Sequence, residues 1–168
     1  YEFTPSPCTT PPVSGNTLVS PTSVCENTPI NIGLSGNSVG LGQTYIWQVA
    51  NNPAGPFSDI GNALNYPDSI IIASETQYYR VAVICGASTT FSEPVLLTVF
   101  PSLPAGTYTI NPALATGGSN YASFADAVSA LSCGIAGPVV FEVDPASGPY
   151  NEQVILNPVA GTSDVNTV

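Results

Sequence analysis

Proline and glycine recur along the whole chain and divide it into short segments. The 168 residues include 17 Pro and 15 Gly, and both residues interrupt helices and central strands. Between them lie runs in which apolar and polar residues alternate, the pattern of a strand with one buried face. Hydrophobic residues make up 43% of the chain, enough to fill a core. The breakers therefore indicate many short strands joined by turns, and we predict an all-β fold.

The clearest strand signal lies in residues 78–85. Tyr79, Val81 and Val83 fall on one face, and Arg80, Ala82 and Ile84 on the other. The other strands predicted in the first hundred residues are 10–20, 30–34, 45–50, 70–73 and 95–100. Residues 51–55 and 86–88 carry the Pro, Gly and Asn typical of turns. Many short strands with frequent turns predict a β-sandwich over residues 1–100.

The pattern changes after residue 100. The Pro-rich, uncharged residues 101–106 are interpreted as a linker. Residues 107–168 predict a second β-rich unit with strands at 107–110, 138–143 and 153–156, and with one helix at 123–132. Within that helix, Phe124, Ala127 and Leu131 lie on one apolar face, Ser123 is a suitable N-cap and Gly134 closes the end. About 65 residues bury only a modest core, so we expect this unit to be incomplete and to be completed by further chain or by a partner.

The charge balance limits the classes of partner. The formal net charge is −10, and Arg80 is the only Lys or Arg. Nucleic-acid binding requires several basic residues that neutralise phosphates, and docking on anionic lipid has the same requirement. The apolar runs are much too short to span a bilayer. We therefore expect no nucleic-acid partner and no membrane insertion.

The four cysteines indicate the compartment. Cys8, Cys25, Cys85 and Cys133 are widely spaced, form no C-x-x-C pair and have no His beside them. Structural zinc sites usually bring their ligands in close pairs, so two disulfides are the better interpretation. Disulfides persist in oxidising surroundings, and we expect a secreted protein at the extracellular cell surface.

A search for catalytic and metal-binding residues gives little. Without His or Lys, acid–base chemistry would depend on carboxylates such as Glu142, Asp144 and Glu152, but acids two apart on a strand are typical of an exposed polar face. Asp126 and Asp164 could join Glu142 and Asp144 as calcium ligands, but no D-x-D-x-D-G loop is present. We expect no enzyme activity, no cofactor and no resident metal.

Aromatic side chains offer one binding hypothesis. Tyr45, Phe57, Tyr66 and Tyr150 could stack on sugars if they are exposed, whereas packing in the core or at its rim is the alternative.

The placement of the core aromatics resembles the immunoglobulin family. That family carries a Trp on the third strand, packed over a disulfide between two sheets, and a Tyr two residues before the second Cys of that disulfide. Trp47 and Tyr79 stand at the matching places, and Val81 occupies the position of the second Cys. The resemblance implies that contact among Trp47, Val81 and Ile32 or Leu34 replaces the central disulfide. The alternative is that Trp47 and Tyr79 are ordinary core aromatics.

A second resemblance covers most of the chain. It is to immunoglobulin-like modules of large secreted proteins of the Bacteroidetes type, many of them exported by the type IX system, and it is carried by SPTSVCENTPINIGLSGNSVGLGQTYIWQ and TQYYRVAVICGAST. The later stretch AGTYTINPALATGGSNYASFADAVSALSCGIAGPVVFEV is similar to a segment that opens a right-handed parallel β-helix there. The helix 123–132 would then cap the open coil. In such a sandwich Cys8 would pair with Cys85, and Cys25 with Cys133.

These expectations favour a non-catalytic structural or adhesive module with protein partners. Edge strands and the open C-terminal unit would offer backbone groups to a neighbour, and the chain could itself assemble into an extracellular filament. The alternative is a carbohydrate-binding or accessory region of a β-helical polysaccharide-degrading enzyme, with a glycan as the partner.

Overall fold

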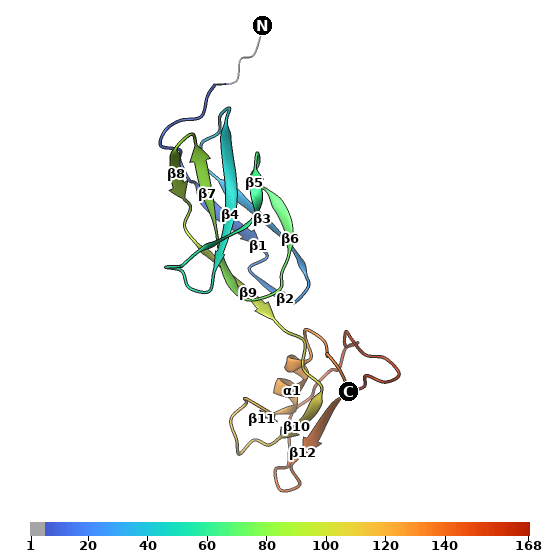
Figure 1. Cartoon of the computed structure of the whole chain (residues 1–168). Coiled ribbons are helices and arrows are strands. Elements are labelled where there is room, and N and C mark those ends of the chain that lie inside the picture. Colours follow the sequence, from blue (N-terminus) through green and yellow to red (C-terminus); the bar gives the residue numbers. More distant parts are fainter. Residues whose placement is uncertain (1–5) are drawn as a thin grey trace. The chain divides into compact units, whose positions relative to one another are not determined.

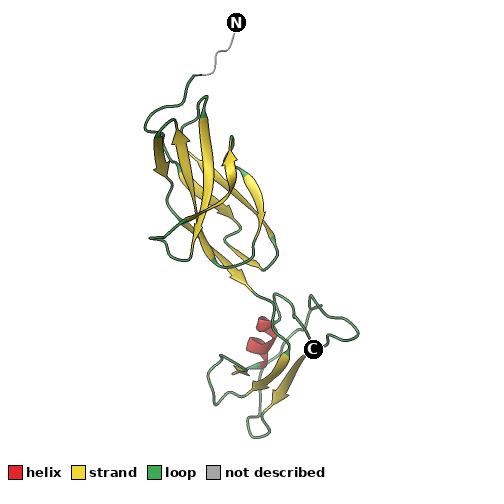
Figure 2. Ribbon diagram, viewed as in Figure 1, coloured by secondary structure: helices red, strands yellow, loops and turns green. Residues whose placement is uncertain are grey.

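Strands dominate the computed structural model, which describes residues 6–168 (Figures 1 and 2). The all-β prediction is confirmed, because the described residues contain twelve strands and one short helix. The chain divides between Phe100 and Pro101 into two compact units. The first unit contains β1 (Asn16–Ser20), β2 (Ser23–Cys25), β3 (Pro29–Ser35), β4 (Gln43–Ala50), β5 (Ser58–Leu64), β6 (Ser69–Ile72), β7 (Gln77–Cys85), β8 (Ser88–Phe91) and β9 (Val95–Phe100). The second contains β10 (Gly106–Ile110), β11 (Asn120–Tyr121), helix α1 (Phe124–Ala130) and β12 (Val139–Val143).

The first unit consists of two sheets. One has three antiparallel strands in the order β1-β3-β6, and the other has six strands, with β2-β9-β7-β4-β5 in order and β8 paired to β7. The β2–β9 pair is parallel, and the other pairs of this sheet are antiparallel. Strands β4 and β7 form the longest ladder, in which Trp47 lies opposite Val81.

Alternation along the strands places one apolar face of each sheet in a shared core. Ile32 and Leu34 come from β3, and Trp47, Tyr79 and Val81 come from β4 and β7; all five are buried in a single cluster. The two sheets therefore pack face to face around these side chains. Burial of apolar surface on this scale is the main stabilising contribution of the unit.

Two edges of this unit differ from the sequence predictions. The predicted strand 10–20 begins at Asn16, because Pro11 and Pro12 have no N–H for a ladder and the Val13 N–H donates to Ser38 Oγ instead. Strand β5 was not predicted, since its sequence shows no alternation and almost all of it is exposed. Gly61 has a φ of +71° where the β4–β5 register shifts between Tyr45 and Trp47, and glycine adopts that backbone without strain.

The second unit is organised around parallel pairing. Strand β10 pairs in parallel with both β11 and β12, in the order β11-β10-β12. Parallel neighbours need a crossover, and helix α1 lies in the connection that leads from β10 by way of β11 to its other neighbour β12. Its core contains Tyr108, Ile110, Ala127, Leu131 and Val139.

Helix α1 is shorter than the predicted 123–132. It begins after Ser123, whose Oγ accepts a hydrogen bond from the Asp126 backbone at 3.0 Å, as expected of an N-cap. It ends at Ala130 with Leu131 as C-cap. The early end follows from the next backbone turn, which is closed by Gly134 at a φ of +84°.

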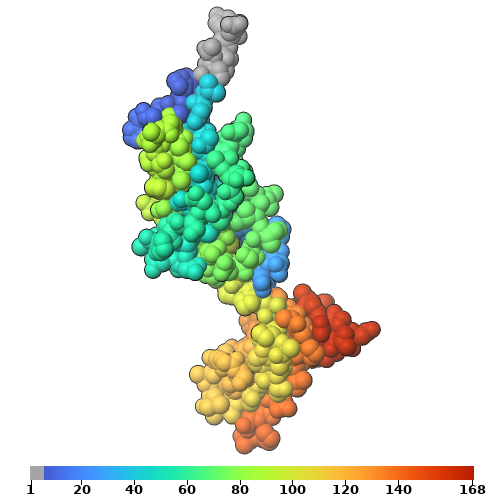
Figure 3. All heavy atoms as spheres, viewed as in Figure 1, coloured from blue at the N-terminus to red at the C-terminus, as the bar shows by residue number. Residues whose placement is uncertain are grey.

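Two segments of the second unit contradict the sequence interpretation. Residues 101–106 are not a free linker, because the backbone of Leu103 bonds to Gly134 and Ala136 at 2.8 Å and its side chain packs on the second core. The predicted strand 153–156 is wrong: Val154 to Leu156 are exposed and form no ladder. The neighbouring Glu152 is committed to the helix terminus instead. The red part of Figure 3 shows this C-terminal segment at the surface of the second unit.

Candidate binding pocket at the end of the first unit

A pocket of about 630 Å³ opens at the end of the first unit, between residues 35–42 and 65–68. That volume falls within the range of small-ligand sites. The pocket is lined by Asn37, Val39, Leu41, Tyr45, Tyr66 and Asp68, among others. We call it the end pocket.

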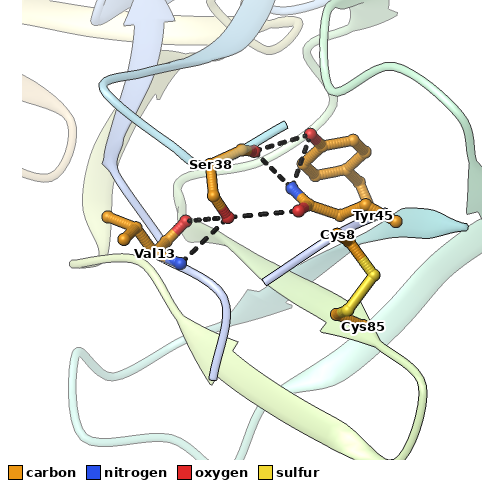
Figure 4. Close-up of a disulfide and its surroundings, with 6 residues drawn as sticks. Cys8, Val13, Ser38, Tyr45 and Cys85 are labelled. Atoms are coloured by element: carbon orange, nitrogen blue, oxygen red, sulfur yellow. Dashed lines mark hydrogen bonds between the residues drawn. A yellow bond between two sulfur atoms is a disulfide. The ribbon is translucent and has the colours of Figure 1, made fainter. Parts of the chain in front are cut away.

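A hydrogen-bonded polar cluster includes three residues that line the end pocket, Asn37, Gln43 and Tyr45, and Figure 4 shows part of it around Ser38 and Tyr45. The buried Tyr45 hydroxyl accepts from Gln43 Nε2 at 2.8 Å and from Asn37 Nδ2 at 3.0 Å. Ser38 Oγ donates to Gln43 Oε1 at 3.1 Å and accepts from the Val13 backbone at 3.0 Å. Gln43 Nε2 also donates to the Ser38 carbonyl. These bonds fix loop 37–43, because each buried polar group has a partner that it would lose if the loop moved.

A disulfide secures one wall of the pocket. Cys8 is bonded to Cys85 with a Cα–Cα distance of 5.9 Å, which confirms the predicted pairing. The Cys8 backbone donates to Leu41 at 3.1 Å and so ties this segment to the pocket loop. A Cβ on Gly40 would lie 2.4 Å from the Cys8 Cα, so this approach requires glycine.

The opposite wall is held by the core. Trp47 Nε1 donates to the Pro67 carbonyl at 2.7 Å and anchors the loop that carries Tyr66. The Tyr66 side chain is 78% exposed beside the pocket. An aromatic ring held at the mouth of a concave site can stack on a flat or apolar face of a ligand.

The charge of the end pocket restricts the ligand. Asp68 is the charged side chain in its lining, and no Lys or Arg lies there. An anionic ligand would meet a carboxylate without a compensating cation. The charge of the lining therefore favours neutral, polyhydroxylated or apolar ligands over phosphates and carboxylates.

The other three aromatic side chains proposed to bind sugars make contacts within the protein instead. Tyr45 is buried, and its hydroxyl is held by Gln43 and Asn37. The Tyr150 hydroxyl donates to the Ile110 carbonyl at 3.1 Å, and its ring packs edge-on against Phe124. The Phe57 ring covers the Arg80 guanidinium.

Two of the three candidate catalytic carboxylates perform structural tasks. Glu152 accepts from the backbone N–H groups of Phe124 and Ala125, both at 2.9 Å, and so caps helix α1. Asp144 accepts from Asn111 Nδ2 at 3.0 Å and from the Ala146 backbone at 2.9 Å. Glu142 lies exposed on β12. This arrangement does not gather the three carboxylates around a common point.

The candidate calcium ligands are likewise dispersed. Asp126 accepts from the Thr116 hydroxyl at 2.5 Å, and Asp144 is engaged as described. Within residues 6–168, no group of three or more His, Cys, Asp or Glu side chains could hold a metal ion, so Asp126, Glu142, Asp144 and Asp164 form no site there. No helix in the same residues is long and apolar enough to cross a membrane.

Sequence reasoning missed the polar cluster, although a signal was present. Gln43 shares the inward face of β4 with Tyr45 and Trp47, since the three alternate along one strand. A polar residue on a buried face demands hydrogen-bond partners. The need for partners of Gln43 would have predicted hydrogen bonds to the loop that follows β3.

Comparison with known proteins identifies the first unit. The family described as Domain of unknown function (DUF8696) matches residues 14–101, which is more than half of the chain. The chain belongs to the DUF8696 family. The DUF8696 domain spans β1 to β9 and includes the end pocket. No curated protein and no solved structure matches the chain.

The remaining cysteines are also oxidised. Cys25 and Cys133 are disulfide-bonded, and no cysteine in the described residues is free. The predicted bond between these two residues stays a prediction. Disulfides of this number indicate an oxidising, non-cytoplasmic environment.

Proposed function

We propose that the chain is a non-catalytic structural or adhesive module of an extracellular cell-surface protein, able to associate through strand edges. The disulfides support an oxidising location. Two of the carboxylates that could have served catalysis, Glu152 and Asp144, are used for capping and a turn.

One observation carries the adhesive part of this proposal. Strand β6 is an edge of the three-stranded sheet, paired only with β3, and its sequence is Ser-Ile-Ile-Ile. Ile70 is 68% exposed and Ile72 is exposed beside it. Proteins usually protect such edges with Lys, Pro or bulges, and an unprotected apolar edge is a template for strand addition.

Concentration-dependent light scattering tests this function. The oxidised chain should show a mass that rises with concentration, and Ile70→Lys should suppress the rise by placing a charge on the edge. Leu114→Lys is the control, since Leu114 is an exposed apolar residue outside the strands. A monodisperse monomer at high concentration, or equal association in all three proteins, would contradict the proposal.

The lineage and the nature of the second unit belong to the same proposal. Parallel pairing of β10 with β11 and β12 supports the start of a right-handed parallel β-helix in a protein of the Bacteroidetes secreted type. The coding sequence downstream of Val168 provides the test. Further short-strand coils would support this interpretation, and a different domain would contradict it.

The end pocket favours one second candidate, a carbohydrate-binding or accessory region. Tyr66 and a polar lining without Lys or Arg suit a neutral sugar. On a glycan array, Tyr66→Phe should retain any signal because the ring remains, whereas Tyr66→Ala should lose at least about tenfold. Absence of signal above background for the unmodified chain would remove this candidate.

A further inference from the structure

The only cation of the chain is held in a fixed position on the outer face of the six-stranded sheet. The Arg80 guanidinium lies over the rings of Phe57 and Phe91, at 3.8 and 4.2 Å from their centroids. Its Nε donates to Gln48 Oε1 at 2.8 Å. Two cation–π contacts and one directed hydrogen bond therefore position this side chain before any ligand arrives.

Arg80 has no carboxylate partner among its contacts in the described residues. Its polar partner is the Gln48 amide oxygen, and the nearby Asp59 carboxylate accepts from Gln48 Nε2 at 2.6 Å instead. A guanidinium has five N–H donors, and the bond to Gln48 uses the one on Nε. The remaining donors are suited to a carboxylate supplied from outside the chain.

The surroundings of Arg80 are apolar, unlike an ordinary solvent-facing sheet surface. Leu96 pairs with Tyr78, and Phe91 pairs with Ala82, so these side chains share the face that carries Arg80. Phe91 is 48% exposed and Leu96 is 39% exposed. We call Phe57, Tyr78, Arg80, Phe91 and Leu96 the Arg80 face. Exposed aromatic residues around an arginine are typical of the centre of a protein interface, whereas the solvated face of an antiparallel sheet is usually polar.

We propose that the Arg80 face binds a protein segment that presents a single carboxylate among apolar side chains. The apolar residues match the rings and Leu96, and the carboxylate matches the unpaired cation. The inference rests on the proposed adhesive function and adds the class of partner, on a surface different from the β6 edge.

The uniqueness of Arg80 makes a direct test available. In the ¹⁵N-labelled, oxidised full chain, one arginine Nε–H resonance is expected, and it belongs to Arg80. The probes are N-acetyl-phenylalanine, which carries a carboxylate beside a ring, and N-acetyl-phenylalanine amide, which lacks the charge. We expect a saturable shift of this resonance and of the Phe91 and Leu96 amides with the carboxylate, and at least tenfold weaker binding of the amide.

Variants separate the charge from the apolar surface. Arg80→Gln should abolish the preference for the carboxylate, and Arg80→Lys should weaken it because an ammonium does not stack or fork in the same way. Leu96→Ala should weaken binding, whereas Leu18→Ala should leave it unchanged. Leu18 is a matched control, since it is a strand leucine of 48% exposure on the other sheet. Retention of the Cys8–Cys85 bond and of the circular dichroism spectrum checks folding.

Each outcome decides the inference. Equal shifts with both probes, or a preference for the carboxylate probe that persists in Arg80→Gln, would overturn it. Light scattering identifies a second copy as the occupant if association is lost in Arg80→Gln, which would overturn the choice of partner. Failure of the β6 proposal is distinguishable, because Ile70→Lys would then leave association unchanged while the probe titration still succeeds.

Discussion

Asn120 holds the loop before helix α1 with a single amide group. Its buried Nδ2 donates to the carbonyls of Asn111, Leu114 and Ala115 at 3.2–3.3 Å, while its Oδ1 has no partner among the described residues. Three backbone acceptors thus depend on one side chain.

Replacement of Asn120 should therefore destabilise the second unit. Asn120→Ala leaves the carbonyls unpaired and should cost about 1–3 kcal/mol of unfolding free energy. Asn120→Asp should cost more at neutral pH, because a carboxylate would face carbonyl oxygens. Urea unfolding of both variants measures the difference, and equal stability of Asn120→Asp and the unmodified chain would refute the assignment.

The Tyr79 phenol should make the stability of the first unit depend on pH in the alkaline range. Burial raises the pKa of the Tyr79 phenol above its ordinary value of 10.0, and the Glu75 carboxylate raises that pKa further. Below about pH 10 the phenol is protonated in both states and adds no pH dependence. Above about pH 10, the phenol loses its proton in the unfolded chain before it does so in the folded chain. The free energy of unfolding therefore declines as the pH rises through the folded pKa.

Urea midpoints at about pH 8 and about pH 10.5 check this effect. The unmodified chain should lose stability between the two, and Tyr79→Phe should lose less. Tyr66→Phe serves as the control, since it removes a phenol from an exposed ring outside the core. An unchanged decline in Tyr79→Phe would assign the effect to other groups.

The identity of the core residues could be predicted because strand periodicity is strict. Trp47, Tyr79 and Val81 are buried in one cluster, as alternation along β4 and β7 indicates. The stacking of Arg80 between two rings could not be predicted, because Phe57 lies outside the named strands and reaches Arg80 only in the folded unit. Long-range side-chain contacts leave no local pattern in the sequence.

At the scale of elements, helix α1 depends on a residue far along the chain. Its seven residues are too few to be stable alone. The Glu152 carboxylate accepts from two N-terminal backbone groups, and a negative charge there also complements the helix dipole.

We expect Glu152→Ala to destabilise the second unit by about 1 kcal/mol, with Ser123→Ala comparable. Glu142→Ala, which removes an exposed carboxylate from β12, is the matched control and should be nearly neutral. Hydrogen exchange of the helix amides reports the effect locally. Equal exchange rates in Glu152→Ala and Glu142→Ala would show that the cap is unimportant.

Elements with strong alternation could be predicted, and those defined by their neighbours could not. β7 combines alternation with β-branched residues and was found with nearly correct bounds. β5 is an exposed edge whose pairing follows from β4 rather than from its own sequence. Conversely, residues 153–156 have the composition of a strand but pair with no neighbouring strand. The sequence of a segment does not show whether a strand is available to pair with it.

At the scale of the whole molecule, Arg80 is also the only site for trypsin. The Arg80–Val81 bond lies inside β7, which pairs with β4 and with β8 and β9. Native chain should resist cleavage, and cleavage should track unfolding of the first unit, with one cut and no other. Arg80→Gln should remain intact even in denaturant. Rapid cutting under native conditions would contradict the burial of this strand.

The same cut tests the disulfides, since it places Cys8 and Cys25 on one fragment and Cys85 and Cys133 on the other. With Cys25 and Cys133 replaced by Ser, the fragments should separate only after reduction, through Cys8–Cys85. With Cys8 and Cys85 replaced instead, the fragments should again stay joined if the predicted Cys25–Cys133 bond exists. Separation without reductant in that variant would disprove this pairing.

The Cys8–Cys85 bond also has a mechanical consequence. It spans 77 residues of sequence, and a fully extended chain reaches about 3.4 Å per residue. Tension applied along the backbone would bypass this stretch through the sulfur atoms, so roughly 260 Å of contour length stays locked while the bond is oxidised. Under load, this segment would thus act as a short, inextensible link, and reduction would allow it to extend.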